Sequence, residues 1–380
     1  MGKGASIILC LAVAALITLG LVMLASASAK WDHASDQYSY LVRQAIWLSI
    51  GIVVLTFMAL MDYRILQKLT WPLFIGVCVA LVLCYVPGIG DAAKGEKRWI
   101  ILPVIGRFQP SEPAKLVIMV ALASWFAKYQ AETKSFVRGF VIPSFILGVP
   151  LLLILFEWDM GTAAGLGAAG LIVLFVAGTR ARYLGGAAFV AALLFIQMVQ
   201  LNPNRMKRIT AFLDLETHKE GAAWQQWLAT QAFGNGGLGG MGLGNGVVKQ
   251  MNLPEHHTDF IFPIIGEELG VFVAMGVVLC FVVIFLVGLG ISMQASDRFG
   301  GVLGIGITSA LIIPAMMNLG VTTASLPNTG LPLPFVSYGG SSLVFSFAMV
   351  GVLLSILRRS GAVDVTEMPA VKQKVLEVRL

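Results

Sequence analysis

Residues 5–28 read ASIILCLAVAALITLGLVMLASAS, an apolar run without a charged side chain. A helix of about 20 such residues spans the hydrocarbon core of a bilayer. The small residues at its end also suit a signal peptide, but the apolar region of a signal peptide is only about 7–15 residues long. We therefore predict that this run is the first membrane helix and that it is retained.

Comparable runs recur along the whole chain. Of its 380 residues, 57% are hydrophobic and 12% charged, and the mean hydropathy is +0.85. Soluble domains carry about 25% charged residues, so this composition indicates an integral membrane protein. Long runs favour helices over the alternating segments of an outer-membrane barrel. We predict an all-α fold of about ten transmembrane helices, near 5–26, 44–61, 70–89, 113–127, 139–157, 160–178, 183–201, 267–293, 302–325 and 339–357.

An even number of spans places both termini on one side of the membrane. The distribution of Lys and Arg over the short connections favours the cytoplasm for that side. We expect a single polytopic domain over 1–380, with a large extracytoplasmic loop at 202–266 and a short cytoplasmic tail at 361–380. The loop is the longest stretch that we expect to be non-helical.

Two segments assigned to the outer side, 88–115 and 202–266, hold more Lys and Arg than orientation alone would favour. They are either solvated loops beside anionic headgroups or a site for an anionic ligand. No basic or aromatic module suggests nucleic-acid binding. Neither the adjacent His256 and His257 nor the cysteines predict a metal site, and all the cysteines lie in apolar runs, which indicates small buried hydrophobes: Cys10, Cys78, Cys84 and Cys280.

The stretch RFQPSEPAK at 107–115 predicts a helix start, with Ser111 as cap. Glu112 and Lys115 are spaced to pair on one helix face. Either the pair pins this helix to its neighbours, or it holds a basic group near a phosphate. In EWDMGT at 157–162, Asp159 is either the cap of the next helix or a functional carboxylate at the membrane edge.

The stretch LPEHHTDFIFPIIGEELG at 253–270 places Asp259 directly before an apolar run. A carboxylate there is either a helix cap or a functional group. We expect Glu267 and Glu268 to be structural, capping the first turn of the eighth membrane helix. The glycine-rich run at 234–246 predicts tight turns and close backbone approach to a ligand or helix, and the proline-rich segment at 327–342 predicts an extended chain that lines a cavity.

Together these motifs make the chain resemble the SEDS family of shape, elongation, division and sporulation proteins. The resemblance is carried by HTDFIF, GLGNG at 242–246, RWI at 98–100, QPSEPAK, and LPLPFVSYGGSS at 331–342. It covers nearly the whole chain and implies a ten-helix enzyme of the bacterial cytoplasmic membrane. Such an enzyme polymerises lipid II, a disaccharide-pentapeptide on undecaprenyl pyrophosphate, and works with a class B penicillin-binding protein that cross-links the new strand.

The resemblance also assigns residues. The essential aspartate of the family matches Asp259, its Glu–Lys pair matches Glu112 and Lys115, and its PDLGT aspartate matches Asp159. Two departures stand out. Trp158 and Met160 replace the usual proline and leucine around Asp159. In AWQQWLATQAFG at 223–234, Gln225 is retained while Leu228 stands where the family has a second glutamine.

Glycosyl transfer needs a base for the attacking hydroxyl and stabilisation of the leaving pyrophosphate, and a partly desolvated carboxylate suits the first task. We expect Asp259 to be that base. Basic groups would hold the pyrophosphate, and a divalent cation could share that role. The remaining candidate substrate contacts are Arg43, Arg98, Glu112, Lys115, Asp159, Arg205, Arg208, Gln225, Lys249, His257 and Ser337.

Two other functions remain open. A lipid II flippase would use a similar basic cavity without a base, and a non-catalytic scaffold of the division machinery would tolerate loss of Asp259. Within the family, FVAGTRARYLGG at 175–186 and NLGVTT at 318–323 are closer to FtsW than to RodA. We expect the division type.

Overall fold

The computed structural model describes residues 2–28, 39–93, 96–102, 106–251 and 257–360. The predicted tail 361–380 and His256 lie outside these ranges. Among the described residues, eight helices are long and apolar enough to cross a membrane. They are α1 (Gly2–Ser28), α2 (Ser39–Leu60), α6 (Ile142–Phe156, preceded by a π-helical turn at Val137–Val141), α7 (Met160–Ala177), α8 (Ala181–Leu201), α11 (Ile261–Met293), α12 (Arg298–Thr322) and α13 (Gly340–Ser360).

The other two predicted spans correspond to α4 (Thr70–Leu83) and α5 (Ser111–Lys128). The first is only 14 residues long, and the second carries Glu112, Lys115 and Lys128. The helical membrane class is therefore confirmed, although a small sheet joins the helices, and the count of ten stays a prediction. Short helices α3 (Arg64–Lys68) and a 3-10 turn at Gln130–Glu132 complete this part of the chain.

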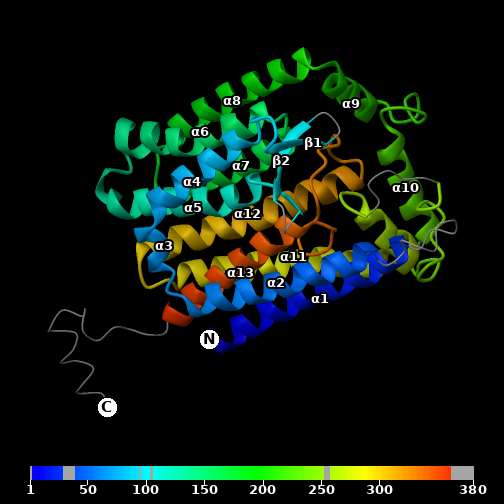
Figure 1. The fold of residues 1–380 in the computed structure, drawn as a ribbon, viewed down its shortest axis with the longest axis horizontal. Coiled ribbons are helices and arrows are strands. Elements are labelled where there is room, and N and C mark those ends of the chain that lie inside the picture. Colours follow the sequence, from blue (N-terminus) through cyan, green and yellow to red (C-terminus); the bar gives the residue numbers. More distant parts are fainter. Residues whose placement is uncertain (1, 29–38, 94–95, 103–105, 252–256, 361–380) are drawn as a thin grey trace.

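The long helices form an elongated bundle (Figure 1). Helices α12 and α13 run through its middle and have 72% of their span residues buried, whereas α8 lies along one edge with 11% buried. The start of α1 and the end of α13 lie at one end of the bundle. The proline-rich segment before α13 lies at the other end, near the strands and α10 (Trp224–Gly236).

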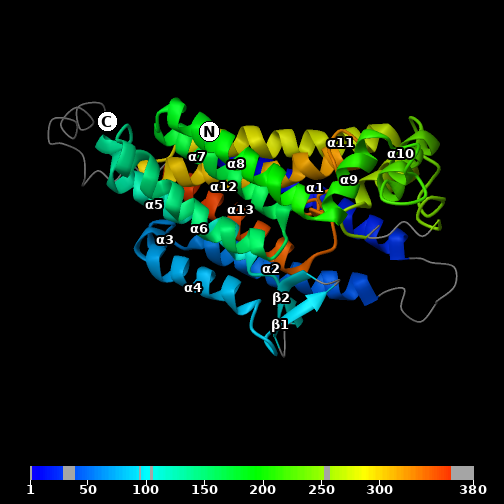
Figure 2. The same cartoon turned by 90° about the horizontal axis from the view of Figure 1, so that it is seen from above.

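The predicted loop at 88–115 contains a small antiparallel sheet, β1 (Gly90–Ala93), β2 (Glu96–Leu102) and β3 (Gly106–Phe108), in the order β1-β2-β3. Gly90 pairs with Ile100, and Ile101 pairs with Arg107. The sheet projects from the edge of the bundle beyond α4 (Figure 2). It carries Arg98 to the end of the bundle where α6 joins α7.

The expectation that 202–266 is non-helical was wrong. This segment contains α9 (Pro203–Leu213), α10 and the first residues of α11. Asn202 caps α9 by accepting hydrogen bonds from the backbone N–H groups of Asn204 and Arg205. Helix α10 buries Leu228, Ala229 and Ala232 against Phe260 and Val321. These helices are short and are stabilised by tertiary contacts, so they produce no long apolar run in the sequence.

The glycine-rich run packs against the first part of α11, as its composition predicted. Helix α11 is broken at Gly270, whose φ is 81°. A Cβ at Gly270 would lie 2.4 Å from the carbonyl oxygen of Leu238, and one at Gly236 would lie 2.0 Å from that of Gly266. Only glycine permits the positive φ at Gly270, and only a residue without a Cβ permits the close backbone contacts at both positions. The eighth span therefore begins earlier than predicted and is divided by a kink.

Candidate active site

The segment Asn328–Leu331 lies at the centre of the candidate site. Asn318 on α12 holds it in place, because its side-chain amide donates hydrogen bonds of 2.7 Å to the carbonyl oxygens of both Leu331 and Asp259. Ser337 ties the same two regions together by donating to the carbonyl of Thr258 at 2.5 Å and accepting from the N–H of Leu333 at 2.8 Å. The predicted extended segment is thus fixed to the turn that precedes α11.

Asp259 lies in that turn and is 9% exposed. Its carboxylate accepts a hydrogen bond of 3.0 Å from the hydroxyl of Thr258. A Cβ on Gly330 would lie 3.8 Å from its Oδ2, so the carboxylate faces the central segment. The alternative role as a helix cap does not fit, because Phe260 is the N-cap of α11 and the helix start has no side-chain cap bond.

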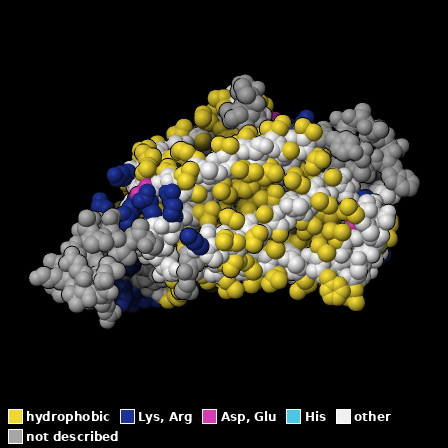
Figure 3. All heavy atoms as spheres, turned by 90° about the horizontal axis from the view of Figure 1, so that it is seen from below, with side chains coloured by type: hydrophobic (Ala, Val, Ile, Leu, Met, Phe, Trp, Pro, Cys, Tyr) yellow, Lys and Arg dark blue, Asp and Glu magenta, His cyan; other side chains and the backbone are white. Residues whose placement is uncertain are grey.

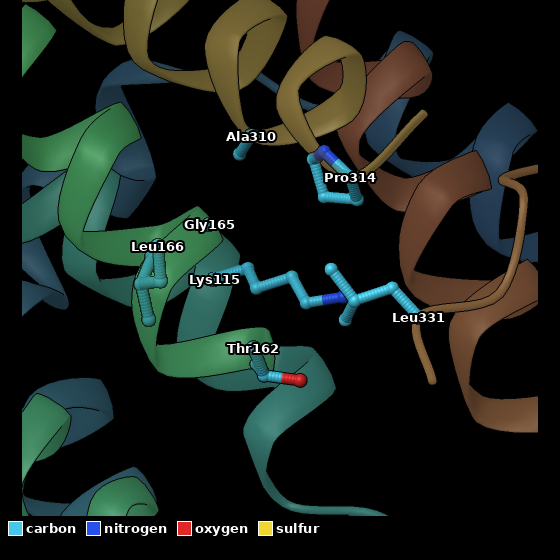
Figure 4. A pocket seen from close by; sticks show the side chains of 7 residues that line it. All are labelled: Lys115, Thr162, Gly165, Leu166, Ala310, Pro314 and Leu331. Atoms are coloured by element: carbon cyan, nitrogen blue, oxygen red, sulfur yellow. The ribbon is translucent and has the colours of Figure 1, made fainter. Parts of the chain in front are cut away.

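Lys115 and Glu112 form a buried ion pair of 2.8 Å on α5. The Lys115 side chain extends from α5 toward Leu331, between α7 and α12 (Figure 4). It lines a cavity of about 10 Å³, room for about one water molecule, together with Thr162 and Pro314. Glu112 Oε2 and Ser111 Oγ are buried without a hydrogen-bond partner among the described residues. The predicted Ser111 cap is wrong, because Pro110 occupies the N-cap position.

Asp159 caps α7, as one of its two interpretations predicted. It accepts hydrogen bonds from the backbone N–H of Thr162 at 3.1 Å and from the hydroxyl of the same residue at 2.9 Å. Its Oδ2 also accepts from Gln109 at 3.3 Å, and Arg98 lies 3.8 Å from its Oδ1. A Cβ on Gly161 would lie 2.7 Å from the carbonyl oxygen of Thr329, so this helix start packs on the central segment. Asp159 is therefore both the N-cap of α7 and part of the candidate site.

Two guanidinium groups meet at one carbonyl oxygen beside this cap. Arg98 from β2 donates to the carbonyl of Trp158 at 2.8 Å, and Arg205 from α9 donates to the same oxygen at 2.7 Å. Arginines from segments about a hundred residues apart are thereby brought together. A guanidinium carries five N–H donors in a planar fork that matches phosphate oxygens. This pair places two positive charges beside the site.

Comparison with known proteins identifies the family. The FtsW/RodA/SpoVE model, described as "Cell cycle protein", matches residues 7–361. The chain belongs to this family. A probable peptidoglycan glycosyltransferase FtsW of Geobacter sp. (strain M18) is 39% identical over 361 residues, which are 94% of this chain and 98% of that protein.

Two solved structures share the fold of this FtsW/RodA/SpoVE member. One chain comes from a peptidoglycan synthase complex that coordinates polymerization and crosslinking, with a TM-score of 0.78 and 27% identity over 93% of this chain and 97% of that chain. The rod shape determining protein RodA of Thermus thermophilus has a TM-score of 0.70 and 25% identity over 93% of this chain and 96% of that chain.

The two sequence departures from the family pattern have structural consequences. Trp158 has a φ of 62°, which proline cannot adopt because its ring fixes φ near −65°. Leu228 is fully buried in an apolar cluster with Val248 and Phe260. The neighbouring Gln226 instead donates to the carbonyls of Val321 and Leu326, at 3.0 and 2.8 Å. It anchors α10 to the end of α12.

The predicted contact Lys249 lies in a second buried network. It donates to Glu268 at 2.6 Å, to the carbonyl of Gly244 at 2.8 Å and to the hydroxyl of Ser26 at 3.0 Å. Glu267 accepts from the backbone N–H groups of Val247 and Val248. The expectation that the two glutamates cap a first helix turn is wrong, because both lie just before the break at Gly270 and bind the glycine-rich run.

The remaining predicted contacts lie around the site at different distances. Gln225 accepts a hydrogen bond of 2.7 Å from Asn328 in the central segment. The ring of His257 contacts Tyr40 and Tyr338, with centroids 4.7 and 6.0 Å away. Arg43 is exposed on α2, and Arg208 is half-buried on α9. Substrate contact by these residues stays a prediction.

Glu157, at the junction of α6 and α7, is 1% exposed, and both its carboxyl oxygens are without a hydrogen-bond partner among the described residues. Burial raises its pKa to about 8, and the nearby carboxylate of Asp159 adds to the increase. In the described part of the chain, no three His, Cys, Asp or Glu side chains cluster as metal ligands. The divalent cation stays an untested expectation.

Sequence reasoning missed Asn318, Gln109 and Thr329. Asn318 was visible as a lone amide in an apolar run, and such groups bond across helices. The hydroxyl of Thr329 is buried without a partner among the described residues, beside the start of α7. No local pattern marks it, because its position depends on how the central segment folds back onto α7.

Proposed function

We propose that this protein is a peptidoglycan glycosyltransferase that polymerises lipid II into glycan strands, in cell division rather than elongation. The observation that carries the proposal is the convergence of Asp259, Lys115 and Asp159 on the segment Asn328–Leu331. A carboxylate, an ammonium group and a capped helix start form one buried polar site in a membrane protein. The relative named FtsW matches 94% of this chain and supports the same activity.

In the reaction, the hydroxyl of the acceptor sugar attacks the anomeric carbon of the donor. The new glycosidic bond forms as the bond from that carbon to the pyrophosphate breaks, with inversion at the carbon. The hydroxyl proton passes to the carboxylate of Asp259, and undecaprenyl pyrophosphate leaves with the electron pair. The carboxylate of Asp259 is 9% exposed and faces the segment 328–331, the position proposed for the acceptor hydroxyl.

The leaving pyrophosphate needs positive charge that is in place before the bond breaks. Lys115 supplies an ammonium group held by Glu112 at 2.8 Å, and Arg98 and Arg205 supply two guanidinium groups at the carbonyl of Trp158. Glu112 Oε2, Ser111 Oγ and Thr329 Oγ1 have no hydrogen-bond partner among the described residues, and a bound water molecule would satisfy such atoms.

The same proposal places the site on the outer face of the cytoplasmic membrane. The start of α1 and the end of α13 lie at the end of the bundle opposite to the site (Figure 1). Lys and Arg side chains gather at that end of the broad hydrophobic surface (Figure 3). By the positive-inside rule, this supports cytoplasmic termini.

A class B penicillin-binding protein is the proposed partner. The support comes from the relative of known structure that belongs to a synthase complex, in which polymerization is coordinated with crosslinking. Such a partner would cross-link the strand as it leaves this site.

The decisive experiment incubates the purified protein and its partner with labelled lipid II and resolves the products on a gel. We expect Asp259→Asn to abolish the polymer while folding and partner binding remain. Asp214→Asn is the matched control, because Asp214 accepts hydrogen bonds from Thr217 in the same extramembrane segment. Equal polymer from wild type and Asp259→Asn would remove Asp259 as the base.

If neither the wild type nor any variant makes polymer, the glycosyltransferase proposal fails. Transport of labelled lipid II across the membrane of proteoliposomes would then identify a flippase. Normal partner recruitment without polymer or transport would identify a scaffold.

A further inference from the structure

An open groove runs along the lipid-facing surface between α4 and α6. It encloses about 420 Å³ and is lined by apolar side chains, among them Ile75, Val79 and Val82 of α4 and Val149 and Leu153 of α6. Most of these side chains are between 43% and 61% exposed, so they face away from the protein core. In a membrane, hydrocarbon covers them.

The volume of the groove fits part of one lipid chain. A cavity of about 150 Å³ holds a six-carbon ring, so this groove holds roughly three such units. That corresponds to the first few isoprene units of a polyprenyl chain. Along α4, the lining residues Phe74 to Leu83 cover about 14 Å of helix.

One end of the groove lies near the junction of α6 and α7, where the candidate active site begins. The hydroxyl of Tyr85, just after α4, donates to the carbonyl of Leu153 at 3.0 Å and so joins the ends of the two helices. Trp158 follows Leu153 by five residues and lies in the turn just after the end of α6 at Phe156. Its carbonyl oxygen accepts from both Arg98 and Arg205. The lining residue Leu153 is therefore only five residues along the chain from the carbonyl oxygen that binds both guanidinium groups.

This combination selects a particular class of lipid. A neutral lipid gains nothing from the two guanidinium groups, and a soluble phosphate gains nothing from the groove. A long hydrocarbon chain with a pyrophosphate headgroup gains from both, since planar guanidinium forks match phosphate oxygens. We propose that the groove between α4 and α6 holds the polyprenyl tail of the lipid-linked sugar substrate, with its pyrophosphate at Arg98 and Arg205.

This inference rests on the proposed function and adds a site for the lipid tail to it. The test is binding without turnover, so that it can fail separately. The full chain is placed in phosphatidylcholine nanodiscs with an undecaprenyl pyrophosphate analogue that carries a photoreactive diazirine in its first isoprene units. After illumination, cross-linked peptides are mapped by mass spectrometry. We expect cross-links in α4 and α6.

Val79→Trp fills the groove, and Val282→Trp is the matched control. Both residues are lipid-facing valines, 52% and 45% exposed, and Val282 lies on α11 away from the groove. We expect Val79→Trp to lower the cross-link yield about tenfold, the loss expected when a few methylene groups lose contact. The control should leave the yield unchanged, and both variants should unfold at the same temperature as the wild type.

Competition identifies the headgroup. Unlabelled undecaprenyl pyrophosphate should abolish the cross-links, whereas an equal amount of phosphatidylglycerol should not. Equal competition by phosphatidylglycerol would show an unspecific lipid groove and overturn the inference, as would cross-links that map outside α4 and α6 or that survive Val79→Trp. Asp259→Asn should keep the cross-links, so loss of polymerisation and loss of tail binding can be told apart.

Discussion

Two buried Lys–Glu pairs in this molecule have the same chemistry and opposite surroundings. Lys249 and Glu268 are 2.6 Å apart, and the hydroxyl of Ser26 and the N–H of Gly244 complete the hydrogen bonding of the glutamate. Lys115 and Glu112 are 2.8 Å apart, but one oxygen of Glu112 has no partner among the described residues and Lys115 lines a cavity. The first pair is satisfied within the protein, and the second adjoins a cavity with room for about one water molecule.

The difference separates a structural pair from a functional one. Fully bonded buried networks fix the chain, whereas an unsatisfied buried polar atom requires an explanation. The satisfied pair joins α1, the glycine-rich run and α11, which are far apart in sequence. The other pair lies within one helix, three residues apart, so it contributes nothing to holding different helices together.

The largest expected effect is the loss of activity in Lys115→Met. Removing one preorganised charge from a leaving-group site costs about a hundredfold to a thousandfold in rate. Lipid II polymerisation measured on a gel checks this. Lys115→Met also leaves Glu112 as a buried charge without its cation, so the free energy of unfolding should fall about as much as in Lys249→Met, and the polymerisation rate per folded molecule is what separates the two variants. Normal polymerisation by Lys115→Met would show that the Lys115–Glu112 pair is not the functional one of the two.

Lys249→Met should act in the opposite way. It leaves Glu268 as a buried charge without its cation, which costs about 3–5 kcal/mol of unfolding free energy. Chemical denaturation of the detergent-solubilised protein measures this loss. The fraction that remains folded should polymerise lipid II at the wild-type rate per molecule. If Lys249→Met were stable but inactive, the structural role of Lys249 would be wrong and the predicted substrate contact would be supported.

Glu157 is a third buried glutamate and, unlike the two in the ion pairs, has no salt bridge among the described residues. Neither of its carboxyl oxygens has a hydrogen-bond partner among the described residues. Its pKa is raised from 4.5 to about 8 by burial, so between these pH values the folded state binds a proton that the unfolded state has lost. The free energy of unfolding should therefore decrease as the pH rises from about 4.5 to about 8, by at most about 1.4 kcal/mol per pH unit.

Thermal unfolding across this pH range, compared between wild type and Glu157→Gln, isolates that contribution. The variant should lack the decrease. Glu216→Gln serves as control, because the side chain of Glu216 is 74% exposed. Identical pH profiles for wild type and Glu157→Gln would show that Glu157 ionises normally.

The smallest expected effect is that of Ser26→Ala. The hydroxyl donates to Glu268 at 2.6 Å and accepts from Lys249, and its removal leaves the ion pair itself in place. We expect a loss of about 1–3 kcal/mol in denaturation measurements, typical of one hydrogen bond to a charged group. Ser49→Ala is the control, since the Ser49 hydroxyl bonds only within its own helix among the described residues, to the carbonyl of Ala45. A change no larger than that of the control would show that Ser26 adds nothing to the network.

Much of the fold was predictable because a membrane imposes its requirement locally. Each span must be apolar over about 20 residues, and this can be read in any window of the sequence. The short helices α9 and α10 and the break at Gly270 were not predictable in this way. They depend on approaches such as that of Gly240 to the carbonyl oxygen of Glu268, where a Cβ would lie 2.3 Å away.

By itself, the sequence determined the membrane class and supplied Asp259, Glu112, Lys115 and Asp159 as chemically capable residues. Only the tertiary structure brought three of these onto the segment Asn328–Leu331 and gave Lys249 to a different network. The reason is physical. Whether a buried charge is structural or functional depends on how many of its hydrogen bonds are satisfied, and partners such as Ser26 and Glu268 come together only when distant parts of the chain pack.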